Sequence, residues 1–149
     1  MSLAGPVTPH HVSYSVPDIE AAIRFWRDVF GFELTARFDV AAIGGKGAFL
    51  ASPALRIELW EVDGAAPVPE ERKAPNSDLK TAGTKHLAFQ VTDLPAALNR
   101  LAEAGIGVVA VQAAPTEPMR PYAGPVDKAF SAFIRDPFGS LIELLGPEA

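Results

Sequence analysis

Two histidines and two glutamates stand where they could share a metal ion. His11 and His86 each begin a segment of similar sequence, and Glu58 and Glu143 each lie between an isoleucine and a leucine. Taken singly, each residue has an ordinary explanation at the start or on the outer face of a strand. Two neutral imidazoles and two carboxylates together are a recognised ligand set for a divalent cation, because the carboxylates balance its charge. Since one His and one Glu recur in each half, we expect a metal site formed by these four residues.

An internal repeat carries the four residues. The segment 11–18, HVSYSVPD, is similar to the segment 86–93, HLAFQVTD, and the sequence IEL occurs at both 57–59 and 142–144. Repeats of this kind indicate that one structural unit occurs twice. A pseudo-twofold arrangement of the two halves would bring the two His–Glu pairs to a common centre.

Each half is predicted to begin with a strand and a helix. Asp18 and Asp93 are suited to cap helix N-termini, and apolar residues follow them at helical spacing. Gly31 and Gly105 are suited to the left-handed turn beyond each helix. Short β-prone runs broken by turn residues come next. Each half therefore reads as strand, helix and two or three further strands, which predicts an α+β fold.

Strand alternation predicts which side chains share a face. Successive side chains of a strand point to opposite sides, so apolar residues that pack on a helix leave their neighbours on the other side. His11 and His86 precede the apolar positions of their strands, and Glu58 and Glu143 alternate with aliphatic residues. All four are expected on the face opposite the helix. His10 has no counterpart, because Lys85 takes that place, and we expect it to be structural or exposed.

The repeat also sets the expected boundaries within a single domain, residues 1–149. The first module is expected at 9–63, a linker at 64–84 and the second module at 85–147. The second half contains about ten additional residues, which we place in the proline-rich segment Gln112–Lys128. Both this segment and the linker could simply connect strands and modules. A loop as long as Gln112–Lys128 is also a candidate lid.

Composition narrows the classes of protein that fit. The chain has 149 residues, a net charge of −5, three His and no Cys, which excludes thiol chemistry and thiolate metal sites. Nucleic acid and anionic membranes are not expected partners, because both require a basic patch. An apolar run of ~20 residues and a signal peptide are both missing, which predicts a soluble cytoplasmic protein.

These motifs together resemble the vicinal oxygen chelate superfamily, which includes glyoxalase I, methylmalonyl-CoA epimerase, extradiol dioxygenases and bleomycin-resistance proteins. The resemblance covers nearly the whole chain. Its residues are HVSYSVPDI at 11–19, FWRDVFGF at 25–32, IEL at 57–59, GTKHLAF at 83–89 and DPFGSLIEL at 136–144.

The resemblance implies a fold and a ligand set. The fold is a pair of βαβββ modules whose curved mixed sheets enclose a metal cleft, and members commonly form homodimers. Residue by residue, the implied ligands are His11 and Glu58 in the first module and His86 and Glu143 in the second. This His-Glu-His-Glu set most resembles that of glyoxalase I, and it does not distinguish Ni, Zn, Mn, Fe and Co as the divalent metal ion.

The expected function is that of a metal-dependent lyase or isomerase of the glyoxalase/epimerase type, acting on a small oxygen-chelating substrate. The metal ion would stabilise a developing enolate, and Glu58 or Glu143 would move the proton. Two alternatives remain open: an extradiol-type ring-cleaving dioxygenase, and a metal-free antibiotic-binding protein of the bleomycin-resistance kind. The residues expected to contact substrate are Trp60, Phe133 and Tyr122, although sheet packing alone also explains Phe133.

Overall fold

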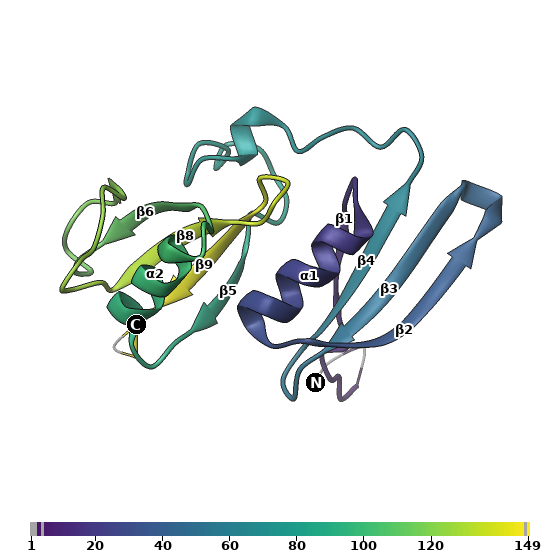
Figure 1. Cartoon of the computed structure of the whole chain (residues 1–149), viewed down its shortest axis with the longest axis horizontal. Helices are drawn as coiled ribbons and strands as arrows, with labels where there is room; N and C mark the ends of the chain where they lie inside the picture. The colour runs from purple at the N-terminus through teal and green to yellow at the C-terminus, as the bar shows by residue number, and fades with distance from the viewer. Residues whose placement is uncertain (1–2, 4, 148) are drawn as a thin grey trace. The chain divides into compact units, whose positions relative to one another are not determined.

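The chain folds into two compact units of similar design. The computed structural model describes residues 3, 5–147 and 149. The units span Met1–Ala66 and Pro67–Ala149 and are called the N-terminal and C-terminal units below. Each contains one mixed sheet and one helix of ten or more residues (Figure 1). The α+β fold with two modules is therefore confirmed.

The N-terminal unit is a four-stranded sheet with a single crossover helix. Its elements are β1 (Val12–Ser15), α1 (Ile19–Phe30), β2 (Glu33–Val40), a short 3₁₀ turn (Ala41–Ile43), β3 (Gly45–Ala51) and β4 (Arg56–Val62). The strand order is β1-β4-β3-β2. Strand β1 runs parallel to β4, whereas β3 is antiparallel to both of its neighbours.

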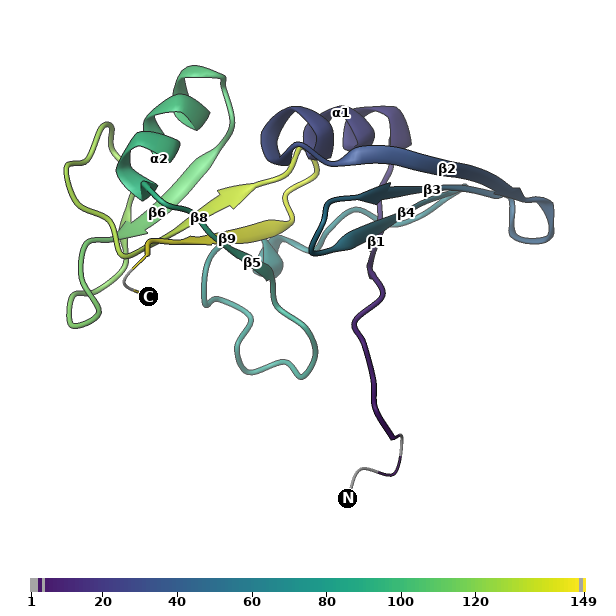
Figure 2. The same cartoon turned by 90° about the horizontal axis from the view of Figure 1, so that it is seen from below.

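Local sequence explains where α1 begins and ends. The Asp18 carboxylate accepts a hydrogen bond of 2.9 Å from the backbone N–H of Ala21, and Gly31 ends the helix in the left-handed conformation with φ of 70°. Between these caps the apolar residues predicted at helical spacing are buried. Figure 2 shows α1 lying along one face of the N-terminal sheet, which leaves the other face free of helices within this unit.

The C-terminal unit repeats this plan with one additional strand. Its elements are a 3₁₀ turn (Glu70–Arg72), β5 (Leu87–Gln90), α2 (Leu94–Glu103), β6 (Val108–Gln112), β7 (Arg120–Pro121), β8 (Ser131–Arg135) and β9 (Leu141–Leu145). The strand order is β5-β9-β8-β6-β7, with β5 parallel to β9. The predicted insertion 112–128 supplies β7, which pairs with the end of β6.

The two cores differ in the kind of side chain that fills them. In the N-terminal unit Trp26 is 1% exposed, and its ring lies 5.4 Å from Tyr14 and 5.6 Å from Phe32. In the C-terminal unit the fully buried side chains are mainly aliphatic, including Leu98 and Ile142. A core with a cluster of aromatic rings and a mainly aliphatic core therefore support the same order of the first four strands.

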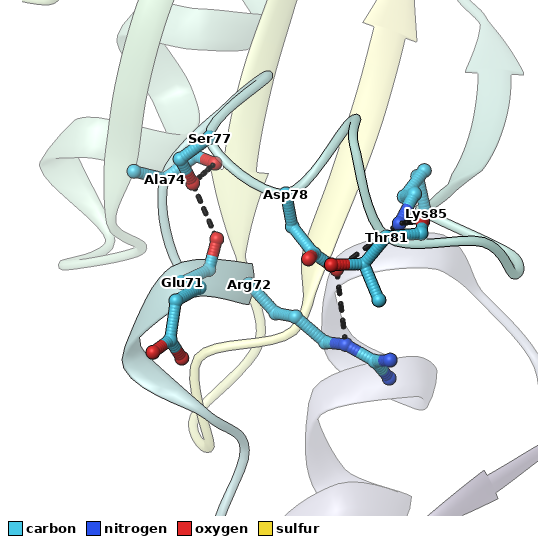
Figure 3. A network of polar contacts seen from close by, with 7 residues as sticks. All are labelled: Glu71, Arg72, Ala74, Ser77, Asp78, Thr81 and Lys85. Atoms are coloured by element: carbon cyan, nitrogen blue, oxygen red, sulfur yellow. Dashed lines mark hydrogen bonds and ion pairs between the residues drawn. The ribbon is translucent and has the colours of Figure 1, made fainter.

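The segment predicted as a linker is folded onto the C-terminal unit. The Asp78 carboxylate accepts hydrogen bonds from Arg72 Nε at 3.2 Å and from Lys85 Nζ at 3.0 Å (Figure 3). The backbone carbonyl of Lys73 accepts a bond of 2.7 Å from Arg135 Nε of β8. The residues before β5 are thus held by ion pairs and hydrogen bonds at both ends.

The described part of the chain contains no helix long and apolar enough to cross a membrane.

Candidate metal site

The first His–Glu pair lies in the N-terminal unit. His11 directly precedes β1, and Glu58 lies in the adjacent parallel strand β4. His11 Nε2 is 3.3 Å from Glu58 Oε2, and the two side chains are 33% and 15% exposed. The imidazole also packs edge-to-face on Phe49, with ring centres 5.5 Å apart. A nitrogen and a carboxylate oxygen therefore meet at one partly open point of the sheet.

The second pair lies at the equivalent place in the C-terminal unit. His86 precedes β5, and Glu143 lies in the parallel neighbour β9. His86 Nε2 is 3.1 Å from Glu143 Oε2, and the imidazole packs edge-to-face on Phe133 at 5.0 Å.

Strand register makes the equivalence of the two pairs exact at the level of single residues. Phe49 lies opposite Glu58 in the β3–β4 pairing, and Phe133 lies opposite Glu143 in the β8–β9 pairing. Each unit thus presents a His, a Glu and a Phe in the same mutual arrangement. The prediction that each glutamate faces away from its helix is met in both units, because Ile57, Leu59, Ile142 and Leu144 are the buried neighbours.

The immediate partners of the two glutamates differ. The Ser131 hydroxyl donates a hydrogen bond of 2.7 Å to Glu143 Oε1. In the N-terminal unit the equivalent of Ser131 is Gly47, which carries no hydroxyl. No sequence pattern singles out Ser131, and only the strand register identifies it.

A chain of hydrogen bonds leads to His11 from the protein surface. Arg56 NH1 lies 2.9 Å from His10 Nε2, and His10 Nδ1 lies 2.7 Å from His11 Nδ1. A guanidinium can only donate, and a neutral imidazole carries one N–H, so His10 accepts at Nε2 and donates from Nδ1. This leaves the His11 proton on Nε2, facing Glu58. His10 is exposed, as expected, but it also sets the tautomer of His11.

The donor set of each pair suits a divalent cation, because imidazole nitrogen and carboxylate oxygen are ligands for most first-row divalent metals. The cation would take the place of the Nε2 proton on each imidazole. Each unit supplies two donors, and no group of three or more His, Asp or Glu side chains with metal-ligand geometry occurs among residues 3, 5–147 and 149. Each pair is therefore half of the predicted ligand set, and their union stays a prediction.

The residues predicted to contact substrate have unequal surroundings. Trp60 is half-buried on β4, and its ring lies 5.0 Å from that of Phe38, which the sequence had not singled out. Phe133 is only 3% exposed and packs on His86, so it serves first to hold that imidazole. Tyr122 is half-buried just beyond β7, where its backbone N–H donates to the carbonyl of Val109 at 3.0 Å.

A small pocket adjoins His86 within the C-terminal unit. Its volume is about 320 Å³ including the open mouth, and its lining includes Arg72, Asp78, Lys85 and His86. The pKa of Asp78 is lowered by a hydrogen bond from Thr81 and by the Lys85 and Arg72 cations. The folded segment 72–85, part of which is drawn in Figure 3, ends directly before His86 in the sequence.

The turn between β8 and β9 is held by one buried carboxylate. Asp136 is 6% exposed, and its Oδ1 accepts hydrogen bonds from the backbone N–H groups of Phe138 at 2.9 Å and Ser140 at 2.8 Å. Burial raises the pKa of Asp136, and these hydrogen bonds act in the opposite direction. The turn fixes the start of β9 and hence the strand that carries Glu143.

Comparison with known proteins identifies the class to which this fold and these paired donors correspond. The family model described as "Glyoxalase/Bleomycin resistance protein/Dioxygenase superfamily" matches residues 8–144. The chain therefore belongs to this superfamily, as the sequence motifs suggested.

Two relatives are named as epimerases. A 2-epi-5-epi-valiolone epimerase of Actinomyces sp is 31% identical over 96% of this chain and 81% of its own length. An ethylmalonyl-CoA/methylmalonyl-CoA epimerase of Cereibacter sphaeroides is 34% identical over 67% of this chain and 72% of its own length. These relatives support an enzyme of the glyoxalase/epimerase type.

Solved structures agree in fold. A glyoxalase family protein from Enterococcus faecalis is 22% identical, with a TM-score of 0.71 over 93% of this chain and 96% of that one. Glyoxalase I of Leishmania major is 20% identical, with a TM-score of 0.68 over 96% of this chain and 88% of that one.

Proposed function

We propose that the protein is a divalent-metal-dependent isomerase that moves a proton at a carbon next to a carbonyl group, and that epimerisation is its reaction. One observation carries the proposal: each unit brings a His nitrogen and a Glu oxygen together, at 3.3 Å in one and 3.1 Å in the other, at equivalent positions of the sheet. The proposed metal ligands are His11, Glu58, His86 and Glu143.

A divalent cation bound by such donors supplies Lewis-acid stabilisation of negative charge on the substrate oxygens. The protein contributes the base. A glutamate carboxylate takes the proton from the carbon next to the carbonyl, the C–H electron pair forms the enolate, and return of a proton to the carbon regenerates the carbonyl. General base catalysis of this kind typically contributes about 10²–10⁴ in rate.

The proposed substrate class is a small molecule with two neighbouring oxygens and an acidic C–H. A methylmalonyl thioester has such a C–H between two carbonyl groups, and a cyclic polyhydroxy ketone has one beside its carbonyl. Trp60 and Phe38 lie on the same face of the N-terminal sheet as Glu58, and their rings would cover an apolar part of the substrate.

Two measurements test the proposal. The purified protein is stripped with a chelator and reloaded separately with Ni²⁺, Zn²⁺, Mn²⁺, Co²⁺ or Fe²⁺, and bound metal is measured by elemental analysis. Each sample is then incubated in D₂O with methylmalonyl-CoA and with a ketone cyclitol, and loss of the α-proton signal is followed by NMR.

The expected result is one metal ion per complete ligand set and metal-dependent exchange of one substrate class. A His11→Ala/His86→Ala variant is the matched control and should neither bind metal nor exchange the proton. A wild-type protein that retains no ion, or that exchanges neither substrate with any ion bound, contradicts the proposal.

A further inference from the structure

The two glutamates have the same place in the repeat but different neighbours on the adjacent strand. Glu58 lies opposite Phe49, and the next residue of β3 on the same face is Gly47. Glu143 lies opposite Phe133, and the next residue of β8 on that face is Ser131. A hydroxyl is therefore present beside one glutamate, and the equivalent position beside the other has no side chain.

Ser131 and His86 together engage both oxygens of Glu143. The hydroxyl, in a residue only 2% exposed, donates to Oε1 at 2.7 Å, while Oε2 lies 3.1 Å from His86 Nε2. A carboxylate with a partner on each oxygen is restricted in its rotation about the last side-chain bond. A charge-assisted hydrogen bond of this kind is also stronger than one between neutral groups.

Glu58 has no such restraint. Oε2 lies 3.3 Å from His11 Nε2, and Oε1 has no hydrogen-bond partner within the described residues. A hydroxyl could not be placed at position 47 without movement, because a Cβ there would be 2.3 Å from the ring of Phe38. Burial does not separate the glutamates, since their side chains are 15% and 20% exposed. The difference lies in the hydrogen bond.

We propose that Ser131 is a positioning residue that makes the two glutamates unequal. It holds Glu143 in one orientation as the permanent metal ligand, and it leaves Glu58 as the carboxylate that can turn away from the ion and take the substrate proton. The inference rests on the proposed function and assigns separate roles to its two carboxylates. In the step so assigned, the substrate C–H bond breaks, the proton forms an O–H bond on Glu58, and the electron pair moves into the enolate.

The test compares two serine-to-alanine variants, one in each unit. Ser131→Ala removes the hydroxyl that holds Glu143. Ser13→Ala is the matched control, because Ser13 lies beside Glu58 in the parallel pairing but makes no hydrogen bond to it in the described part of the chain. Co²⁺ is titrated into each metal-free protein and binding is followed by its visible absorption, at a temperature well below the unfolding midpoint of each variant.

Removal of a residue that orients a metal ligand typically lowers metal affinity about 10–100-fold. We expect such a loss for Ser131→Ala and an unchanged affinity for Ser13→Ala. The Co²⁺ absorption spectrum of Ser131→Ala should also change, because Glu143 is no longer held in one orientation.

Failure of the positioning role of Ser131 and failure of the proposed function give different results. If wild-type protein binds Co²⁺ and catalyses exchange, but Ser131→Ala binds it as tightly as Ser13→Ala, the positioning role of Ser131 is wrong and the proposed function stands. If wild-type protein binds no Co²⁺, the proposed function is wrong and this inference with it. A Ser13→Ala protein that loses as much affinity as Ser131→Ala also overturns the unequal roles.

Discussion

The N-terminal and C-terminal units place the same pair of donors on the same two strands, yet they support those donors with different residues. In the N-terminal unit His11 forms a side-chain hydrogen bond with His10, and Gly47 lies near Glu58 on the adjacent strand. In the other, Glu143 is held by Ser131. The repeat has kept the donors and the aromatic residue that packs on each imidazole, whereas the surrounding hydrogen bonds have diverged. The two His–Glu pairs are therefore expected to differ in their roles, although the two units share one fold.

The segment before each histidine shows the same divergence. His10 lies at the surface, between Arg56 and His11. Its counterpart in the repeat, Lys85, is anchored by Asp78 to a folded connection. One histidine is thus preceded by a surface imidazole and the other by an ion pair.

The largest effect is expected from replacing the glutamates themselves. Glu58→Gln and Glu143→Gln should each lower the exchange rate by about 10²–10⁴, because the base or its metal ion is lost. The variants should separate when cation is added in excess. Glu143→Gln should recover part of its activity, since its defect is in binding, whereas Glu58→Gln should not. Exchange rates measured against Co²⁺ concentration provide the check, and equal recovery of both variants would contradict unequal roles.

The repeat, the helix caps and the strand faces could be predicted from the sequence because they depend on local spacing. Asp18 and Asp93 each accept a backbone N–H three residues on, as capping residues do. The α+β fold and the face of the sheet on which each glutamate lies followed from the same spacing.

Side-chain partners from distant strands could not be predicted in this way. Ser131 acts on Glu143 across a strand pairing, and Phe38 covers Gly47 only because β2 pairs with β3. The folded state of the predicted linker depends likewise on Arg135, far along the chain. Such contacts need the register, which the sequence pattern alone does not specify.

The next effect concerns stability and tests the contact between Phe38 and Gly47. A Cβ at Gly47 would lie 2.3 Å from Phe38 Cζ and 3.0 Å from the carbonyl oxygen of Leu59. Gly47→Ala should therefore lower the free energy of unfolding by about 1–3 kcal/mol, as overpacking does. Urea unfolding at constant pH measures this.

Gly107 provides the matched glycine in the C-terminal unit. Its added Cβ would meet only Arg135 Cβ at 3.9 Å, which is an ordinary contact. Gly107→Ala should leave stability unchanged or raise it by about 0.4–1 kcal/mol through the unfolded state. If Gly47→Ala is as stable as Gly107→Ala, the Phe38 ring can move away from the added methyl group, and the predicted overpacking is wrong.

An effect on stability of similar size is expected at the turn between β8 and β9 and at its counterpart between β3 and β4. Asp136→Ala should cost about 1–3 kcal/mol, because two backbone N–H groups lose their acceptor. Asp136→Asn keeps the Oδ1 acceptor and should cost less. Since burial raises the pKa of Asp136 in the folded state, its contribution to stability is greatest at low pH and falls as pH rises through that pKa. The difference in the free energy of unfolding between wild type and Asp136→Asn should therefore narrow or reverse from pH 4 to 7.

In the N-terminal unit the corresponding turn is held by an uncharged group. Ser52 Oγ accepts the backbone N–H of Leu55 at 3.2 Å. Ser52→Ala should destabilise the protein by an amount that does not depend on pH between 4 and 7. Urea midpoints at several pH values test both turns, and a pH-independent gap for Asp136→Asn would exclude the assigned role of burial.

The smallest effect is expected from two carboxylates that form ion pairs, Asp78 in the C-terminal unit and Glu20 in the N-terminal unit. The pKa of Asp78 is lowered by the Thr81 hydrogen bond and by Lys85, and that of Glu20 is lowered by the hydrogen bond from Arg37. A carboxylate with a lowered folded-state pKa contributes stability above its ordinary pKa, and this contribution is lost as pH falls through the folded value. Asp78→Asn and Glu20→Gln should therefore lower the urea midpoint at pH 7, and this effect should shrink as the pH is lowered through the folded-state pKa of each carboxylate. Asp78 has the larger expected shift, because its side chain is 11% exposed against 53% for Glu20 and exposed pairs are screened by solvent. If Glu20→Gln shifts the midpoint as much as Asp78→Asn, the folded connection before His86 is no better anchored than an ordinary surface pair.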